Sequence, residues 1–307
     1  MNNDVLPSPG CFDFQFFQIV FLHLIPDVYI FPLHKVELLS NYNTQSKEES
    51  VFIFAEWSHQ LHSMGLVHII GIVSAALFGI GGGFLAKKTK TPEKVYAVTG
   101  ITLIVLELLK LFFMISTTGT YPLEKIPFQI CTVELFFLWA VPLVKNEKVK
   151  NGMIAYTVIG LMAASFYYVK PSTILNSSYI FLSLQAMVWH NVVIMIGVFS
   201  IVYYNIYGKK GKRYIIDGYI LWLVLTFVAI IVDVICAKTI PEANINFFYL
   251  SPLQDSVTYP VLNLLFKKPS PYPIYLISFI IYYSLGVAAL YGLLTGIDVI
   301  KEKHKAK

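Results

Sequence analysis

The chain has 307 residues, of which 56% are hydrophobic and 13% are charged. This composition excludes an ordinary soluble domain, because too few polar side chains remain to cover a water-facing surface. The net charge of +5 does not indicate a nucleic-acid partner, since the lysines form short clusters between apolar runs. The three cysteines, Cys11, Cys131 and Cys236, are widely spaced and predict neither a disulfide framework nor a zinc site. We expect no cofactor and no metal.

Residues 1–50 are predicted to form an N-terminal extension of the membrane domain. An apolar run over 12–33 contains Pro26 beside Asp27, so it predicts either one extra membrane-spanning helix or an interfacial segment. The polar stretch 41–50 is typical of a linker. Removal of 1–50 is therefore expected to leave the remaining domain folded.

Residues 51–300 are predicted to form an all-α, polytopic membrane helix bundle with seven core transmembrane helices. Most of the apolar segments approach the roughly 20 residues that cross a bilayer. They cover 66–86, 95–118, 126–144, 152–169, 179–207, 214–237 and 272–296. The fifth is too long for a straight span, so we expect its first part, near 179–186, to project or bend. The aromatic and proline-rich stretch 239–271 predicts a structured cap.

The connecting segments alternate in charge along the chain. One set carries Lys87, Lys88, Lys90, Lys94, Lys145, Lys148, Lys150, Lys209, Lys210, Lys212, Arg213, Lys301, Lys303, Lys305 and Lys307. The other set carries Lys35, Lys47, Lys125, Lys170, Lys238, Lys267 and Lys268. The positive-inside rule therefore predicts a multi-pass protein of the cell membrane whose basic tail, 301–307, is cytoplasmic.

Ionisable groups within the apolar segments are candidates for function. In a helix over 126–144, Glu134 would lie one turn from Cys131 on the same face. His190, in the fifth segment, is expected at a similar depth in the outer half of the bundle, where lipid ester linkages lie. Glu107 and Lys110, spaced i, i+3, predict a structural ion pair. His68 and Asp233 lie near helix ends, where solvation and function are both open, and the inner halves of the helices look apolar.

Over about residues 52–300 the sequence resembles the YwaF-like integral membrane proteins of bacteria and their animal relative, the transmembrane protein 164 group. The matching features are a histidine in MGLVHIIGI, a proline four residues before a cysteine in IPFQICTVE, and a histidine in WHNVVIMIG. NFFYLSP and PYPIY follow in the same order. The animal relative is an acyltransferase that remodels ether phospholipids with an essential Cys and His. A more distant family of membrane lipid hydrolases pairs Thr with His. The resemblance implies that Cys131 and His190, 59 positions apart, are the corresponding pair.

These observations lead to one main hypothesis of function, a membrane-embedded lipid acyltransferase or lipid ester hydrolase. Cys131 would attack an acyl ester of a membrane phospholipid or other acyl lipid, and His190 would act as base and then acid. Asn191, Gln129 or loop amides would stabilise the oxyanion. The expected supporting or substrate-binding residues are His68, Gln129, Glu134, Asn191, Asp233, Asn246 and Tyr249.

Two alternatives stay open. In a small-solute or proton transporter, Glu107, Lys110, Glu134, His190 and Asp233 would line a polar path. Such a path should continue polar residues through the inner half of the bundle or break a helix at the midplane. A non-catalytic receptor or assembly factor is the third hypothesis. Oligomeric state is not indicated by the sequence.

Overall fold

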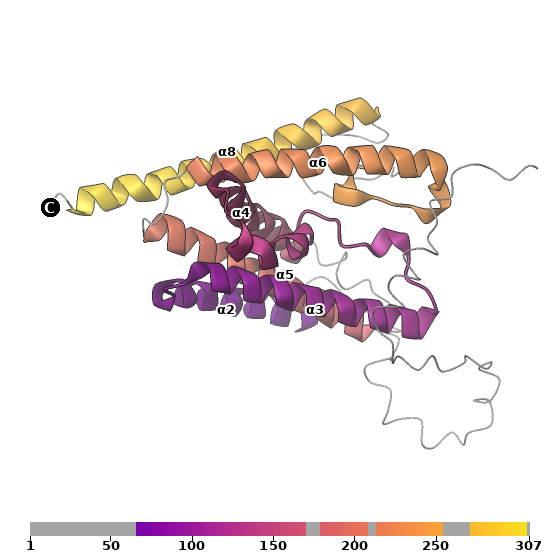
Figure 1. The fold of residues 1–307 in the computed structure, drawn as a ribbon, viewed down its shortest axis with the longest axis horizontal. Coiled ribbons are helices and arrows are strands. Elements are labelled where there is room, and N and C mark those ends of the chain that lie inside the picture. The colour runs from indigo at the N-terminus through magenta and orange to yellow at the C-terminus, as the bar shows by residue number, and fades with distance from the viewer. Residues whose placement is uncertain (1–65, 170–178, 208–212, 254–270, 306–307) are drawn as a thin grey trace, which may run out of the picture. The chain divides into compact units, whose positions relative to one another are not determined.

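The computed structural model describes residues 66–169, 179–207, 213–253 and 271–305. In this part of the chain, six helices are long and apolar enough to cross a membrane. They are α2 (Leu66–Lys88), α3 (Pro92–Thr118), α4 (Glu147–Val169), α5 (Ile180–Ser200), α6 (Arg213–Thr239) and α8 (Tyr272–Lys305) (Figure 1). The predicted all-α, polytopic membrane bundle is confirmed. The predicted N-terminal extension, with its apolar run 12–33, lies outside the described residues.

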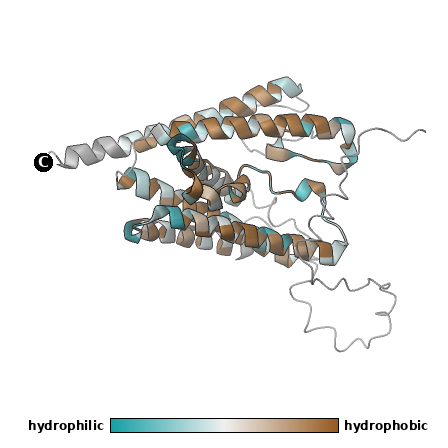
Figure 2. Ribbon diagram, in the orientation of Figure 1, coloured by the Kyte–Doolittle hydropathy of each residue, from teal (hydrophilic) through white to brown (hydrophobic). Residues whose placement is uncertain are grey.

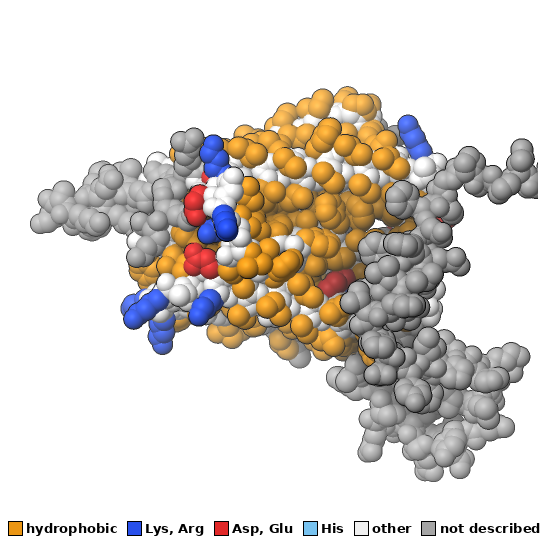
Figure 3. Space-filling view, viewed as in Figure 1, with side chains coloured by type: hydrophobic (Ala, Val, Ile, Leu, Met, Phe, Trp, Pro, Cys, Tyr) orange, Lys and Arg blue, Asp and Glu red, His pale blue; other side chains and the backbone are white. Residues whose placement is uncertain are grey.

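Charged side chains mark one end of the bundle, which we call the basic end. It carries Lys87 and Lys88 at the end of α2, and Lys148 and Lys150 at the start of α4. Brown, apolar residues cover the middle of the helices in Figure 2, and an orange apolar surface extends from the charged side chains of the basic end in Figure 3. Exposed apolar side chains on a band of this kind are what a hydrocarbon environment stabilises.

Helix α5 is the central helix of the bundle. It packs against α2, α3 and α4. Of the most apolar 18-residue stretch of this helix, 67% is buried, compared with 17% for α8. Glycine allows the close approach of α2, since a Cβ on Gly82 would collide with the carbonyl of Met195. Residues on α5 are therefore well placed to meet side chains from several other elements.

The chain between α3 and α4 is not the regular helix that the sequence predicts over 126–144. It holds three short 3-10 helices, η2 (Leu123–Lys125), η3 (Val133–Phe136) and η4 (Leu138–Leu143). Pro127 lacks a backbone donor, and Pro142 lies inside η4. The Thr132 side chain also bonds to the backbone of Gln129, which competes with helical pairing. The prediction of a regular third helix is therefore wrong, although this segment still links the far end of α3 to the basic end.

Helix α5 also differs from expectation at its ends. Its first turns, Ile180 to Ala186, are α-helix, which leaves projection as the untested one of the two predicted outcomes, bend or projection. The irregularity lies at the basic end instead, where α5 continues into a π-helix, η6 (Ile201–Ile206). The predicted cap is described only in part: after α6 the chain forms two 3-10 turns, η7 (Pro241–Ala243) and η8 (Phe247–Tyr249).

The basic half of the bundle is not apolar, contrary to the sequence-based expectation. The hydroxyl of Ser200 lies 2.8 Å from that of Tyr96 and 2.7 Å from that of Thr157, and all three side chains are buried. Nearby, the Tyr214 hydroxyl donates to Asn205 Oδ1 at 2.5 Å. Because these groups bond to each other, they can lie inside the bundle without leaving hydrogen-bonding groups unsatisfied.

Candidate functional site

The irregular segment between α3 and α4, which we call the third crossing, carries Cys131. Side chains from other helices bond to its backbone and hold it in position. Trp189 Nε1 donates to the carbonyl of Cys131 at 2.9 Å, and the Tyr156 hydroxyl donates to the carbonyl of Ile130 at 3.2 Å. Non-helical backbone at membrane depth must be satisfied by protein groups, since lipid offers no partners. Trp189 and Tyr156 therefore supply hydrogen bonds that the backbone of this segment would make to itself in an α-helix.

Cys131 and His190 are brought together by the fold. The Cys131 sulfur lies 3.4 Å from His190 Nε2, within hydrogen-bonding range for sulfur. On the other side of the ring, Nδ1 lies 2.7 Å from the carbonyl oxygen of Ala186. A carbonyl can only accept, so the proton of the neutral imidazole belongs on Nδ1. Nε2 is then free to accept the thiol proton, which is the arrangement that activates a cysteine nucleophile.

Tyr167 forms one wall of this pair. Its ring lies face to face with the imidazole of His190, with ring centroids 3.4 Å apart and planes 7° apart. Its hydroxyl oxygen is buried and has no partner in the described part of the chain. The ionisable groups of Tyr167 and Tyr249 both lie within electrostatic range of the Cys131 thiol. Neither Tyr167 nor Trp189 was predicted as a site residue. Nothing in the sequence distinguishes them from the other aromatics of the spans.

The loop after α6 is bonded to the segment that carries Cys131. Gln129 Nε2 donates to the carbonyl of Asn246 at 2.7 Å, and Asn246 Oδ1 accepts from the backbone N–H of Ser251 at 2.9 Å. Asp233, fully buried near the end of α6, accepts from the N–H of Phe247 at 2.9 Å. The hydrogen bonds of Gln129, Asn246 and Asp233 thus hold the loop that carries Tyr249.

Backbone strain accompanies these bonds. Phe248 and Tyr249 have φ values of 52° and 62°, a region that bulky side chains rarely adopt. The Tyr275 hydroxyl donates to the carbonyl of Tyr249 at 2.6 Å, and that of Tyr272 donates to the carbonyl of Leu250 at 2.8 Å. Strained residues held by surrounding bonds are frequent at functional sites. Burial raises the pKa of the Tyr249 phenol, which therefore stays protonated and able to donate.

His68 and Asn191, two of the predicted supporting residues, join helices through their hydrogen bonds. His68 Nε2 lies 2.7 Å from the carbonyl of Tyr168. Asn191 accepts from the Tyr168 hydroxyl at 2.5 Å and donates to Ser74 at 2.9 Å. His68 and Asp233 are both buried, so the interpretation of these two as solvated interface groups is wrong.

Glu134 is fully buried, and neither carboxyl oxygen has a partner among the described residues. Its carboxyl group packs directly against Gly160 of α4. Glu134 lies in the 3-10 helix η3, which begins two residues after Cys131, so the two residues do not share the predicted α-helical turn. Burial of an unpaired carboxyl group is costly. The position of the Glu134 side chain is set by packing against α4 and not by a described hydrogen bond.

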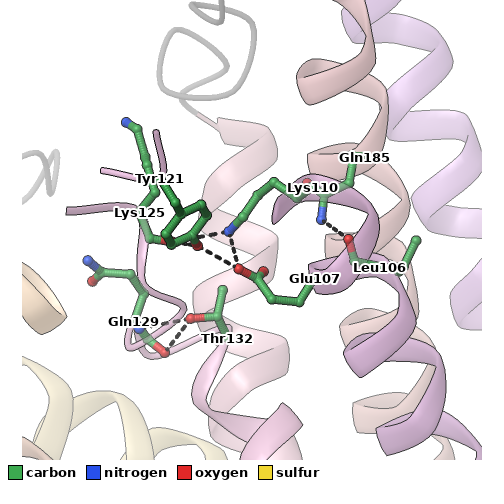
Figure 4. A network of polar contacts seen from close by, with 8 residues as sticks. All are labelled: Leu106, Glu107, Lys110, Tyr121, Lys125, Gln129, Thr132 and Gln185. Atoms are coloured by element: carbon green, nitrogen blue, oxygen red, sulfur yellow. Dashed lines mark hydrogen bonds and ion pairs between the residues drawn. The ribbon is translucent and has the colours of Figure 1, made fainter. Parts of the chain in front are cut away.

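The predicted ion pair of Glu107 and Lys110 is confirmed. Lys110 Nζ lies 2.7 Å from Glu107 Oε1, and the Tyr121 hydroxyl donates to the same oxygen at 2.7 Å (Figure 4). Lys110 also donates to the carbonyl of Lys125. Burial, and then the nearby carboxylate, raise the pKa of Tyr121, so this phenol remains a donor. The pair neutralises itself and fastens α3 to the start of the third crossing.

Within the described residues, no group of three or more His, Cys, Asp and Glu side chains is arranged to hold a metal ion. The thiol of Cys131 and the imidazole of His190 meet at the site, and the ring of Tyr167 is stacked on that imidazole.

Comparison with known proteins identifies the family. The model of the TMEM164 family matches residues 54–291, a span that includes Cys131, His190 and every supporting residue named above. No curated protein and no solved structure matches the chain significantly. The match covers more than half of the chain and agrees with the resemblance that the sequence motifs indicate. The chain is a multi-pass membrane protein that belongs to the TMEM164 family.

Proposed function

We propose that this protein is a membrane-embedded lipid acyltransferase or lipid ester hydrolase in which Cys131 is the nucleophile and His190 the general base. One observation carries the proposal: Nε2 of His190 faces the Cys131 sulfur at 3.4 Å while Nδ1 is bonded to a carbonyl. The substrate class is an acyl ester of a membrane lipid, because the pair lies inside a bundle whose outer surface is apolar.

The reaction begins when Nε2 of His190 takes the thiol proton and the Cys131 sulfur attacks the ester carbonyl. A sulfur–carbon bond forms, and the carbonyl oxygen becomes an oxyanion. Collapse breaks the ester carbon–oxygen bond, and the leaving alkoxide takes the proton from His190. A second hydroxyl, from an acceptor lipid or from water, then attacks the thioester with His190 again as base. The acceptor decides between transfer and hydrolysis.

The supporting residues have two roles in this proposal. Gln129, Asn246 and Asp233 hold Tyr249 and the loop near the thiol, while His68 and Asn191 keep α2, α4 and α5 in register. One amide N–H of Asn191 donates to Ser74, and one of Gln129 donates to the carbonyl of Asn246, so each amide has one N–H left for an oxyanion.

The test is acyl transfer by membranes that contain the full chain. A phospholipid with a labelled acyl chain is supplied with a lysophospholipid, and both the new phospholipid and the free fatty acid are measured. Cys131→Ala and His190→Ala should each lower the total turnover by about a hundredfold or more, as expected for the loss of a nucleophile or base. Cys236→Ala, which removes a partly exposed cysteine on α6, is the matched control and should keep wild-type turnover. Full turnover by Cys131→Ala would refute the proposal.

A small-solute or proton transporter is the second candidate, and two observations favour it. The third crossing is irregular, as in transporters with broken helices, and buried polar groups continue into the basic half. However, the hydroxyls of Tyr96, Thr157 and Ser200 bond to each other, and Glu107 is paired with Lys110. Solute uptake by reconstituted vesicles that persists in Cys131→Ala, without acyl transfer by the wild type, would reverse the ranking.

We also propose that the protein lies in the cell membrane with its basic end in the cytoplasm. The positive-inside rule supports this orientation, because the lysine clusters gather at the ends of α2, α4 and α8. A reporter that works only in the cytoplasm should be active when it is fused after Lys307. Activity of a fused reporter that works only outside the cytoplasm would contradict this orientation.

A further inference from the structure

The hydroxyl of Tyr167 is a buried hydrogen-bond donor that no described protein group uses. The ring that carries it makes a face-to-face contact with His190 and an edge contact with Tyr168. A polar group in such a position is costly unless something bonds to it during function.

Other side-chain donors of the site each make a hydrogen bond within the protein. Trp189 donates to the carbonyl of Cys131, Gln129 to that of Asn246, and Asn191 to Ser74. The neighbouring Tyr168 donates to Asn191. Tyr167 is thus the donor against the Cys131 and His190 pair that has no partner in the described chain.

We propose that the Tyr167 hydroxyl is an oxyanion donor, which binds the carbonyl oxygen of the acyl group while that group is attached to the Cys131 sulfur. This inference rests on the proposed function. A donor at the atom where negative charge develops is the arrangement that stabilises a tetrahedral intermediate.

The hydroxyl keeps its proton throughout this step. When the sulfur attacks, the electron pair of the carbonyl double bond moves to oxygen, and the Tyr167 hydroxyl donates a hydrogen bond to that oxyanion. When the double bond reforms, the alkoxide leaves with the proton of His190 and the hydroxyl again faces a neutral carbonyl oxygen. The ring has a separate effect, because its face lies against an imidazole that becomes cationic during the step.

The test separates oxyanion stabilisation from activation of the thiol. Tyr167→Phe keeps the stacked ring and removes only the hydroxyl. Tyr168→Phe is the matched control, since it removes the hydroxyl of the next residue, which bonds to Asn191 and not to the pair. Each variant is measured for acyl transfer from a labelled phospholipid and for alkylation of Cys131 by a chain-bearing haloacetamide, a reaction that forms no oxyanion.

The expected result is that Tyr167→Phe loses about a hundredfold in acyl transfer, as for removal of one oxyanion donor, but alkylates Cys131 at the wild-type rate. Tyr168→Phe should transfer acyl groups far better than Tyr167→Phe. Wild-type transfer by Tyr167→Phe would overturn the inference while leaving the Cys131 and His190 proposal intact. Equal loss of transfer and alkylation would also overturn it, because the residue would then act on the pair itself.

Failure of the proposed function has a different signature, since Cys131→Ala would then retain full transfer. If Tyr167→Phe does not fold, fluorotyrosine at position 167 keeps both ring and hydroxyl while changing donor strength. Transfer at an unchanged rate across a series of fluorotyrosines would overturn the inference in that case.

Discussion

The carboxyl group of Glu134 packs against Gly160, so closely that any Cβ at position 160 would overlap Oε1. This contact places the 3-10 turn after Cys131 directly on α4, the helix that also carries Tyr167. The absence of a side chain at Gly160 therefore allows the third crossing to pack directly on α4. It is required by space rather than by its backbone conformation.

Gly160→Ala is expected to destabilise the protein by about 1–3 kcal/mol, the usual cost of overpacking a buried contact. The measurement is thermal unfolding of the purified protein in detergent. Gly81→Ala on α2 is the matched control, because a Cβ there meets nothing within 4 Å. The control should be neutral or slightly stabilising, as alanine is the better helix former. Equal melting temperatures for the two variants would contradict the close packing of Glu134 on Gly160.

Asp233→Ala is expected to loosen the loop that follows α6. The carboxylate accepts the N–H of Phe247, and its removal leaves a buried donor unsatisfied, at a cost of about 1–3 kcal/mol. Asp233→Asn keeps an acceptor oxygen and should remain close to wild type. Hydrogen exchange of residues 240–253 measures the effect, with faster exchange in the alanine variant only. Faster exchange in both variants would mean that the charge, and not the acceptor, holds the loop.

Six of the seven predicted membrane helices and the ion pair of Glu107 with Lys110 follow from the sequence, the helices from apolar length and the pair from i, i+3 spacing. Depth in the bundle allowed Cys131 and His190 to lie level, and the resemblance to the family implied that they form a pair. The broken third crossing was not predicted, because an apolar run over 126–144 looks the same whether it is α-helical or not. Only the two prolines and the Thr132 side chain distinguish it, and their effect depends on partners such as Trp189 and Tyr156.

The roles of the supporting residues could not be predicted for a similar reason. His68, Asn191 and Asp233 are polar groups in apolar segments, which marks them as important without saying for what. Their partners, the Tyr168 carbonyl, Ser74 and the Phe247 N–H, are set by packing between distant segments. Tyr167 was missed because its contact with His190 depends on the register of α4 against α5, which no local pattern encodes.

The ion pair of α3 makes a prediction about coupled substitutions. Lys110→Met removes the cation beside the largely buried Glu107 carboxylate and leaves the Tyr121 hydroxyl as its partner among the described residues, which is expected to cost about 3–5 kcal/mol. The double variant Glu107→Gln with Lys110→Met removes both charges and should be more stable than Lys110→Met. Thermal unfolding of the two single variants and the double variant provides the comparison. A double variant that loses the sum of the single losses would mean that the charges do not interact.

The last prediction concerns the reactivity of Cys131. Because His190 Nε2 faces the sulfur and can accept its proton, a chain-bearing haloacetamide should alkylate Cys131 faster than Cys236, which has no described imidazole partner. His190→Ala should suppress alkylation of Cys131 without slowing that of Cys236, as measured by mass spectrometry of each cysteine-containing peptide. His68→Ala is the matched control: it removes another buried histidine, whose Nε2 faces the carbonyl of Tyr168 and not the thiol. This control should leave the rate at Cys131 unchanged, provided that both variants keep the wild-type melting profile. Alkylation of Cys131 at the wild-type rate in His190→Ala would mean that the 3.4 Å contact is structural, and that the imidazole does not activate the thiol.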